Sequence, residues 1–367
     1  MKIKVDKLEF LNALRVSSAA ASQKATIAIL SSTLLRTTDT CLKVCATDLD
    51  LGIVYEVKAD IIEAGAIAAP TDRLISIIDS LPNGEVEITT TKNNTVMIHT
   101  NVCDFRISSY SSDDFPKMPE FEYSTVITLK QRDLANLIDM TSFAISREET
   151  RYIFNGSLFK IKDNILTIVA TDAKRLALVK HTLSNSVAEE VAAIIPLKAI
   201  LEIRSNVSTE TDEDVSLSFN KNMVLISFKK MSMISRLTEG TYPEYQHIIP
   251  EVSETRMSIN RMALLSASIR ASLLVTTEHQ SVKFEVYKDK VIVSKVTPDI
   301  GDLKAEISES ITYNGSDMSI GFQPAYVIEL LKNIQNDTIV FELTAPERPV
   351  VLRLPNYVHV LLPMRLN

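Results

Sequence analysis

The chain has 367 residues, of which 46% are hydrophobic and 23% are charged, a globular composition whose length predicts two or three domains. Its net charge of −7 argues against a protein that binds phosphates over its whole surface, although a single basic face is compatible with it. No run of 18 uncharged apolar residues indicates a membrane span, and the acidic residues of MKIKVDKLEF do not fit a signal peptide, so we expect a cytoplasmic protein.

The first third of the sequence contains two similar units, each with the order strand, helix and three strands. Apolar and polar residues alternate in the strands, as Val86 and Ile88 show, and Asn-Gly at 83–84 is typical of a turn. The first unit has predicted elements at 2–5, 7–19, 28–36, 41–47 and 52–58. The second has them at 65–70, 72–81, 85–91, 95–101 and 104–110.

Two sequence features recur at nearly constant spacing. Ala-Thr-Asp occurs at 46–48 and, 124 positions later, at 170–172, and the same step predicts a third site at 294, where the sequence reads Ser-Lys-Val. Predicted helices begin at Pro70, Pro196 and Pro324, 126 and 128 positions apart, and proline suits the first turn of a helix. We interpret Ala-Thr-Asp as a strand end whose Thr and Asp satisfy local backbone groups.

Each predicted helix carries an apolar stripe at helical spacing, which predicts one buried face. In the proline-led helices the stripes are Leu74, Ile77, Ile78 and Leu81, then Leu197, Ile200 and Leu201, then Val327, Leu330, Leu331 and Ile334. In the earlier helix of each third they are Leu11 and Leu14, then Leu134, Leu137 and Ile138, then Met262, Leu265 and Ile269.

The repeats predict an α+β protein of three similar domains, each a pair of β-α-β-β-β half-repeats. The predicted domains are 1–122, 123–251 and 252–367, with boundaries near the segments rich in Pro, Glu and Ser at 111–124 and 243–256. An array of similar units that curves in one sense tends to close into a ring, alone or with a second copy.

Four segments together resemble the β subunit of bacterial DNA polymerase III, the sliding clamp family. They are SREETRYIFNGSLFK at 146–160, VATDAKRLAL at 169–178, SRLTEGTYPEYQHIIP at 235–250 and VLLPMRLN at 360–367. The resemblance spans the whole chain and includes the threefold repeat. It implies the DNA clamp fold, with helices lining a ring and sheets outside, and a non-catalytic processivity factor for DNA replication that needs no cofactor.

The partners that the resemblance implies are duplex DNA bound without sequence preference and a second copy of the chain in a head-to-tail homodimer. It also implies the polymerase catalytic subunit, a clamp loader and other proteins with clamp-binding motifs. These proteins would insert short peptides rich in Gln, Leu and Phe into a groove between the second and third domains. Carried over position by position, the groove residues are Arg151, Tyr152, Phe154, Thr171, Lys174, Arg175, Leu176, Pro243, His247, Ile248, Tyr326, Val360, Leu362, Pro363, Met364 and Arg365.

Residue types at these positions fit a peptide groove, which needs adaptable apolar walls and a few hydrogen-bond donors. Three positions depart from the family pattern. Ala173 and Lys174 stand where the family often has Gly-His, Leu362 stands where Met is common, and Asn367 adds one residue to the usual end. We therefore expect the same class of peptide with a different ranking of peptides.

A ring explains how an acidic protein can bind DNA, because cations on its inner helices can face the duplex. The candidates are Arg15, Lys24, Arg73, Lys198, Arg261 and Lys332. Each would contribute one screened phosphate contact without sequence information, and each also fits an ordinary solvated helix residue. For the dimer we expect edge-strand pairing between the first domain of one chain and the third domain of the other, with 104–108 and 264–273 as candidate segments.

The residues alone leave two other functions open. Asp48 and Asp172 would be the paired carboxylates of a metal-dependent phosphoesterase, but equivalent positions in stacked repeats lie too far apart to share an ion. The five histidines form no spaced set, no nucleophile arrangement is present, and Cys41, Cys45 and Cys103 lack nearby ligands and fit small buried hydrophobes. A repeat scaffold that binds only proteins would explain the acidity and the groove without a ring.

Overall fold

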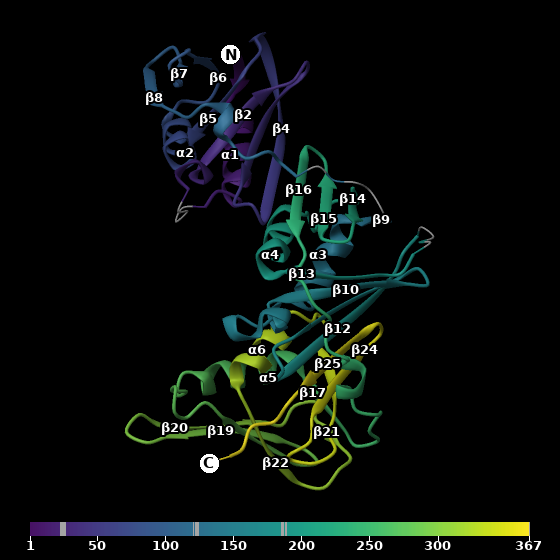
Figure 1. The fold of residues 1–367 in the computed structure, drawn as a ribbon. Coiled ribbons are helices and arrows are strands. Elements are labelled where there is room, and N and C mark those ends of the chain that lie inside the picture. Colours follow the sequence, from purple (N-terminus) through teal and green to yellow (C-terminus); the bar gives the residue numbers. More distant parts are fainter. Residues whose placement is uncertain (23–26, 120, 122–124, 185–186, 188, 367) are drawn as a thin grey trace. The chain divides into compact units, whose positions relative to one another are not determined.

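A computed structural model describes residues 1–22, 27–119, 121, 125–184, 187 and 189–366, with only the backbone of Glu149 and Arg151 (Figure 1). Lys24, a predicted DNA contact, lies outside these residues. The N-terminal unit consists of Met1–Arg132, Val187–Glu189 and Leu201–Leu237, and the C-terminal unit consists of Asp133–Ser186, Glu190–Ile200 and Thr238–Asn367. The second predicted domain therefore contributes strands to both units.

The β-α-β-β-β order occurs six times in the described chain, as the repeats predict. The first two copies are β1 (Lys2–Asp6), α1 (Lys7–Ser18), β2 (Ser32–Thr37), β3 (Cys41–Thr47) and β4 (Leu51–Glu63), then β5 (Ala66–Pro70), α2 (Thr71–Ser80), β6 (Glu85–Thr90), β7 (Thr95–His99) and β8 (Asp104–Ser108). The next two are β9 (Thr125–Lys130), α3 (Gln131–Asp139), β10 (Gly156–Lys162), β11 (Ile165–Thr171) and β12 (Arg175–Thr182), then β13 (Val191–Pro196), α4 (Leu197–Asn206), β14 (Asp214–Phe219), β15 (Met223–Phe228) and β16 (Met231–Arg236).

The last two copies complete the pattern. They are β17 (Arg256–Asn260), α5 (Arg261–Ser272), β18 (Val282–Val286), β19 (Val291–Thr297) and β20 (Gly301–Ile307), then β22 (Met318–Phe322), α6 (Pro324–Lys332), β23 (Thr338–Glu342), β24 (Val350–Leu354) and β25 (Tyr357–Leu361). Short elements lie between the copies, namely β21 (Thr312–Tyr313) and the 3-10 helices η1 (Ala28–Ser31), η4 (Glu149–Phe154) and η5 (Tyr245–Ile248).

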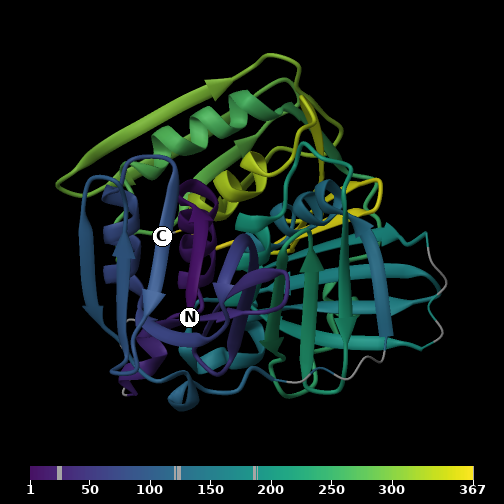
Figure 2. The same cartoon turned by 90° about the horizontal axis from the view of Figure 1, so that it is seen from above.

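The strands form one sheet in the N-terminal unit and two in the C-terminal unit. The first has twelve strands, with the order β8-β7-β6-β1-β4-β16-β15-β14-β9 and with β2, β3 and β5 joined beside β4. The C-terminal unit has a nine-stranded sheet, β13-β10-β11-β12-β25-β24-β23-β17-β21, and a four-stranded sheet, β20-β19-β18-β22. Helix α1 packs beside α2, α5 packs beside α6, and Figure 2 shows α5 lying along β20.

The helices begin where the sequence supplies an acceptor or a proline. The side chains of Asp6 and Asn260 accept backbone N–H groups at 3.0 Å and 2.9 Å at the starts of α1 and α5. Pro324 occupies the first turn of α6, as predicted. For Pro70 and Pro196 the prediction is one residue early, because both end strands and the helices start at the next residue. At Pro70 the backbone is still extended, with φ −56° and ψ 116°.

The predicted apolar stripe of α5 is confirmed only at Leu265, which is 7% exposed. Met262 and Ile269 are 53% and 40% exposed, whereas Leu264, Ala267, Ser268 and Ala271 are buried. These four positions also have helical spacing, but two alanines and a serine carry too little hydrophobicity to stand out beside Met and Ile. Small side chains let α5 approach its neighbours closely, so the larger apolar residues face outward.

Three further expectations need smaller corrections. Leu201 is 47% exposed, and the buried positions of α4 are Ala199, Ile200 and Ile203. Ile334 is buried but follows the end of α6 at Lys332. Residues 28–31 form η1 instead of a strand, since the carbonyl of Ile27 accepts the N–H of Leu30 within the turn.

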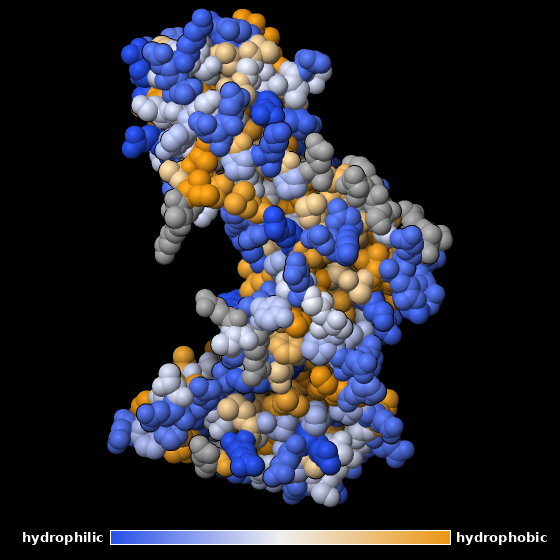
Figure 3. Space-filling view, viewed as in Figure 1, coloured by the Kyte–Doolittle hydropathy of each residue, from blue (hydrophilic) through white to orange (hydrophobic). Residues whose placement is uncertain are grey.

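Most of the surface seen in Figure 3 is hydrophilic, as in ordinary globular proteins. On the face in Figure 3, hydrophilic side chains cover most of the atoms drawn in colour, and hydrophobic side chains form smaller groups between them. No helix in the described part of the chain is long and apolar enough to cross a membrane.

Candidate functional site

The second Ala-Thr-Asp motif forms a turn that is held by its own side chains. The hydroxyl of Thr171 donates to the carbonyl of Arg175 at 2.6 Å and accepts the N–H of Ala173 at 3.1 Å. One carboxylate oxygen of Asp172 accepts the N–H groups of Lys174 and Arg175 at 2.9 Å and 3.0 Å. These contacts satisfy the backbone between β11 and β12, which confirms the interpretation of the motif.

The first copy repeats this arrangement atom for atom. The hydroxyl of Thr47 donates to the carbonyl of Leu51 at 3.0 Å and accepts the N–H of Leu49 at 3.0 Å. The carboxylate of Asp48 accepts the N–H groups of Asp50 and Leu51 at 3.0 Å and 2.7 Å. Leu49 and Ala173 share a left-handed backbone, with φ of 81° and 69°. The motif is therefore a structural unit of the repeat.

The predicted position of the third copy, residue 294, is wrong by two residues. Strand β19 ends at Thr297, as β3 and β11 end at Thr47 and Thr171, and Asp299 has the left-handed backbone with φ 62°. The third domain contains two more residues before this turn, so the constant step of 124 fails. Pro298 replaces the aspartate, and Thr297 donates to the carbonyl of Leu274 instead of to the turn.

Arg175 joins this turn to the last helix. Its side chain is 7% exposed, and its Nε donates to Asp172 at 3.0 Å. The guanidinium also donates to the carboxylate of Glu329 on α6 and to the backbone carbonyl of Phe143. Its central carbon lies 4.2 Å from the centre of the Tyr326 ring. Arg175 is thus fully engaged within the protein and positions the site.

A polar cavity of about 260 Å³ opens beside Arg175 and is lined in part by Lys174, Tyr326 and Glu329. Lys174 is exposed, whereas Tyr326 is half-buried and burial raises the pKa of its hydroxyl above the usual value. The hydroxyl of Tyr326 therefore stays protonated at neutral pH and can donate a hydrogen bond to a ligand in this cavity.

The C-terminal tail is fixed to both sides of this site. The N–H of Leu362 donates to the carbonyl of Lys174 at 3.0 Å, and the N–H of Met364 donates to the carbonyl of Gly321 at 2.8 Å. The side chains of Leu362, Pro363 and Met364 are half-buried, and Arg365 is exposed. A Cβ on Gly321 would lie 2.5 Å from the carbonyl oxygen of Met364, so glycine permits the tail to come this close.

The apolar part of the site lies on the nine-stranded sheet. Leu176 on β12 and Val360 on β25 are directly opposed, and each is 1% exposed. They belong to one cluster with Tyr242, Tyr245 and the partly buried Phe154. The rings of Phe154 and Tyr242 meet edge to face with centroids 6.1 Å apart. Leu176 and Val360, two of the predicted groove residues, are therefore core residues beneath the groove, which we call the groove floor.

The remaining predicted groove residues are on exposed 3-10 segments. Tyr152 on η4 is 60% exposed, and Ile248 on η5 is 44% exposed. Pro243 and His247 are exposed, and the Nε2 atom of His247 lies 3.2 Å from the Oε2 atom of Glu244. Nothing is described for the side chain of Arg151. Residues Thr171 to Leu176, Tyr326 and the tail are thus brought together, with η4 and η5 carrying exposed apolar side chains nearby in the same unit.

Sequence reasoning missed four residues that shape the site. Phe143 and Glu329 bind Arg175, Gly321 holds the tail, and Tyr242 packs against Phe154. Tyr242 lies in a quoted motif, TYPEYQHII, and could have been found there. Phe143 and Gly321 lie in segments without a distinctive pattern. Glu329 lies in the predicted helix that begins at Pro324, but the apolar stripe of that helix does not point to it.

The described candidate DNA contacts all lie on helices, and Arg15 and Arg261 are among those engaged with the protein. Arg15 on α1 forms an ion pair with Asp79 at 2.9 Å, and both side chains are more than half exposed. Arg261 on α5 donates to the carbonyls of Leu331 and Asn336, where it caps the end of α6. Arg73, Lys198 and Lys332 are exposed on α2, α4 and α6.

The described residues offer no support for a metal site. They contain no group of three His, Cys, Asp or Glu side chains placed to hold a metal ion. The carboxylates of Asp48 and Asp172, the candidate pair, each cap a turn of their own. Cys45 is buried, and burial raises the pKa of its thiol to about 11, whereas Cys41 and Cys103 are half-buried.

Three family models of the DNA polymerase III beta subunit match this chain. The N-terminal domain model matches residues 1–119, the central domain model 128–244 and the C-terminal domain model 246–365. The chain is 30% identical over 362 residues to the beta sliding clamp of Staphylococcus epidermidis, covering 96% of this chain and 95% of that protein.

Solved structures of sliding clamps share the whole fold. The DNA polymerase sliding clamp of Bacillus subtilis superposes with a TM-score of 0.94 at 28% identity, and the clamp of Bartonella birtlesii bound to griselimycin does so with a TM-score of 0.94 at 29% identity. Both alignments cover 100% of this chain and 100% of the other chain.

Proposed function

This chain belongs to the DNA polymerase III beta subunit family, and from that premise we propose that two copies close head to tail into a ring around duplex DNA. A protein of this family is a sliding clamp, a processivity factor of DNA replication that is not itself catalytic. Polymerases and other DNA-processing proteins attach to the ring through short peptides in the groove of the C-terminal unit.

Two free sheet edges support the closure of the ring. Among the described strands, β8 pairs with β7 alone and β20 pairs with β19 alone, so each ends its sheet. These strands belong to different units, so each chain has two different free edges. The β8 edge of one chain can pair with the β20 edge of another, which is what a head-to-tail contact needs. Exposed apolar side chains accompany β20 and the adjacent α5, namely Ile269, Leu273, Val296 and Ile300. The candidate segments 104–108 and 264–273 therefore remain our proposal for the interface.

Encirclement suits the weak cationic character of the helices. Arg73, Lys198 and Lys332 are exposed, and Arg15 shares its charge with Asp79, so few strong phosphate contacts are available. Loose contacts favour sliding, and topology then keeps the ring on DNA. The proposed domains, 1–122, 123–251 and 252–367, would each supply two helices to the inner wall.

The engagement of Arg175 carries the groove proposal, because it fixes the Thr171–Leu176 turn and Tyr326 around one cavity. The hydrogen bond from Leu362 to Lys174 ties the tail to the same turn. Half-buried Leu362 and Met364 offer apolar surface that a peptide can cover. The clamp of Bartonella birtlesii has been solved with griselimycin bound, which shows that a relative of this fold accepts a ligand.

Loading onto circular and linear DNA tests the ring. After a loader places the protein on nicked circular DNA, a topological clamp stays in the DNA fraction at high salt and leaves once the circle is cut. A scaffold that binds proteins alone would show no difference between the two DNA forms. Titration of a labelled Gln-Leu-Phe peptide tests the groove, since Met364→Ala should weaken binding, and equal affinities would remove the assignment.

A further inference from the structure

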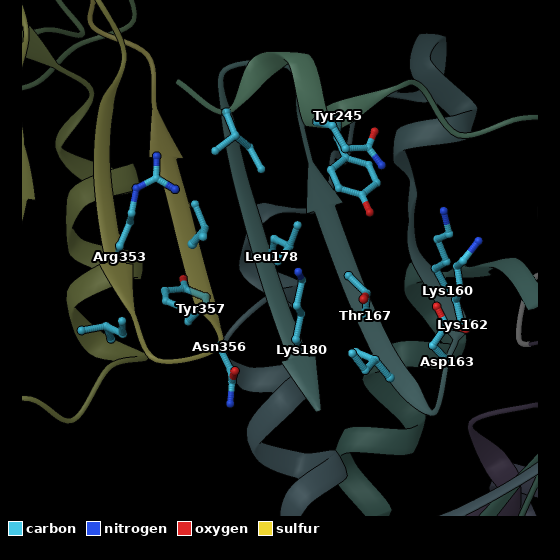
Figure 4. Close-up of a pocket in the computed structure, with 15 residues that line it drawn as sticks. Lys160, Lys162, Asp163, Thr167, Leu178, Lys180, Tyr245, Arg353, Asn356 and Tyr357 are labelled. Atoms are coloured by element: carbon cyan, nitrogen blue, oxygen red, sulfur yellow. The ribbon is translucent and has the colours of Figure 1, made fainter. Parts of the chain in front are cut away.

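An open pocket with a volume of about 670 Å³ lies on the nine-stranded sheet of the C-terminal unit (Figure 4). It involves strands β10, β11, β12, β24 and β25 and the 3-10 helix η5. Its polar lining includes Lys160, Lys162, Thr167, Lys180 and Arg353. None of the predicted groove residues lines this pocket, so it is a different site from the proposed groove.

Cross-strand register gathers two of the lysines on one face of the sheet. Lys160 on β10 is opposite Thr167 on β11, and Thr167 is opposite Lys180 on β12. In Figure 4, Thr167 lies between the two lysines. Since directly opposed residues share a face, both ammonium groups border the same strip of surface.

The two remaining cations of the pocket are already paired. Lys162 forms an ion pair with Glu190 at 2.5 Å, and Asp163 adds a further negative charge near it. Arg353 donates to Glu342 at 3.0 Å and to the carbonyl of Pro250 at 2.6 Å. By contrast, the side chains of Lys160 and Lys180 form no ion pair or hydrogen bond with any residue that the structure describes. Lys160 and Lys180 are therefore the cations of the pocket that remain for a ligand, and with Asp163 also in the lining the net charge of the pocket stays positive.

The pocket and the proposed peptide groove share one hydrophobic cluster beneath them. Leu178 and Val358 line the pocket and share one hydrophobic cluster with Leu176 and Val360 of the groove floor. Leu176, Leu178 and Lys180 alternate along β12, so they lie on one face, and Leu176 is about 13 Å from Lys180 at roughly 3.3 Å per residue. An extended peptide needs about four residues to span that distance.

We propose that the Lys160–Lys180 pocket binds an acidic segment that flanks the linear peptide of a partner protein. The proposal rests on the groove described under Proposed function. Side chains of Asp or Glu pair with the two free ammonium groups, while the apolar stems of the lysines and Tyr245 cover the peptide backbone. Among partners with the same core peptide, those with acidic residues next to that peptide thus bind with higher affinity.

Peptide titrations with the full-length protein test this proposal. The probes are one Gln-Leu-Phe core peptide and versions extended by four Glu residues or four Gln residues, at either end of the core. At about 0.1 M salt, where the screening length is about 10 Å, the better-placed acidic extension should bind about fivefold more tightly than its neutral match. This gain should disappear in Lys160→Gln/Lys180→Gln and shrink at higher salt.

The control variant is Lys221→Gln, which removes an exposed lysine from the turn between β14 and β15 and should retain the full gain. Charge reversal in Lys160→Glu/Lys180→Glu should turn the preference toward a peptide extended by four Lys residues. Equal binding of acidic and neutral peptides to the unaltered protein would overturn the proposal, as would a gain that survives in Lys160→Gln/Lys180→Gln.

Two further readouts separate this proposal from others. If Met364→Ala still weakens the core peptide while the extensions have no effect, the groove stands and the acidic pocket falls. A short duplex oligonucleotide is titrated in parallel, because phosphates also bind lysines. Binding of the duplex that depends on Lys160 and Lys180, without any gain from acidic peptides, would also overturn the proposal.

Discussion

The guanidinium carbon of Arg175 lies 4.2 Å from the centre of the Tyr326 ring and thereby links the second Ala-Thr-Asp turn to α6. Asp172 and Glu329 balance its charge from the two sides of this junction. The first copy of the turn has leucine at 51, the position that corresponds to Arg175. The two turns share their Thr and Asp hydrogen bonds, and Arg175 in place of leucine joins only the second turn to α6.

Replacing Arg175 should destabilise the protein and weaken peptide binding together. Arg175→Ala removes a buried guanidinium from the mostly buried Asp172 carboxylate and the half-exposed Glu329 carboxylate, which should lower the free energy of unfolding by about 3 kcal/mol. Arg175→Lys keeps the charge but cannot reach Asp172, Glu329 and the Phe143 carbonyl together, so we expect an intermediate loss. Urea unfolding and peptide titration measure both effects. Lys174→Ala, at an exposed position, is the matched control and should leave unfolding unchanged.

The paired threonines provide a test of structure against binding. Thr47→Val and Thr171→Val each remove two hydrogen bonds of about 3 Å from equivalent turns, so each should cost about 1–2 kcal/mol of stability. Peptide affinity should fall in Thr171→Val alone, because only that turn adjoins the groove. A similar loss of affinity in Thr47→Val would show that the effect is global destabilisation.

Gly321→Ala should disturb the tail without unfolding the domain. The new Cβ would lie 2.5 Å from the Met364 carbonyl oxygen, a backbone atom, so the tail must shift. Overpacking of this kind costs on the order of 1–3 kcal/mol, and we expect peptide affinity to fall about tenfold. The control is Gly52→Ala, where the closest atom is the flexible tip of Met118. Unchanged affinity in Gly321→Ala would mean that the Met364 bridge does not shape the groove.

The sequence was sufficient for the repeat because local patterns encode it. Alternating strands, proline at helix starts and the Ala-Thr-Asp turn all depend on neighbouring residues. The helix starts lie within a residue or two of their predicted places, whereas β2 begins at Ser32 instead of 28 and β4 ends at Glu63 instead of 58. The third turn was misplaced because its aspartate is replaced by Pro298, so that only Thr297 and a left-handed residue remain of the pattern. The third domain also has two more residues before this turn, and the sequence of the turn itself does not show that the spacing has changed.

The site was harder to predict because its contacts join distant segments. Arg175 and Glu329 are 154 positions apart, and the sequence around one residue does not predict contact with the other. The outward face of α5 was misassigned for a related reason. Met262 and Ile269 look like core residues by hydrophobicity, and their exposure follows from the close packing of Ala267 and Ala271. Tertiary packing, rather than helical period, decides which face is buried.

The buried imidazole of His359 should make the folded protein less stable in mild acid. It is buried, no hydrogen bond of its ring nitrogens to described residues is present, and burial together with the Arg175 charge lowers its pKa to about 3 from 6.5. The unfolded chain therefore binds a proton below pH 6.5 that the folded chain does not bind until about pH 3. Stability should fall with decreasing pH in this window by up to about 1.4 kcal/mol per pH unit.

Urea unfolding at several pH values isolates this contribution. His359→Leu removes the titrating group and should flatten the decline between pH 6.5 and pH 4.5 by about 2–3 kcal/mol, whatever its effect at neutral pH. His247→Leu, at an exposed position, should leave the slope as it is. A decline of equal steepness in His359→Leu and the unaltered protein would show that other groups cause it.

Charges on the two free edges predict the register of the proposed dimer contact. Asp104 and Arg106 are exposed on β8, and Asp302 and Lys304 are exposed on β20. An antiparallel pairing that sets Asp104 opposite Lys304 also sets Arg106 opposite Asp302, since the two strands run in opposite directions. Both cross-strand pairs then join opposite charges.

A charge swap tests this register in solution. Arg106→Asp should repel Asp302, and because a closed ring contains two such contacts the dimer should weaken by about 2 kcal/mol, or roughly 30-fold in Kd. Asp302→Arg should weaken it similarly, and the double variant should recover most of the loss because the charges are exchanged. Analytical ultracentrifugation measures the dissociation constant, with Lys221→Asp, in the turn between β14 and β15, as the control. If the double variant is as weak as the two losses combined, Arg106 and Asp302 are not opposed, and if neither single variant weakens the dimer, these edges do not form it.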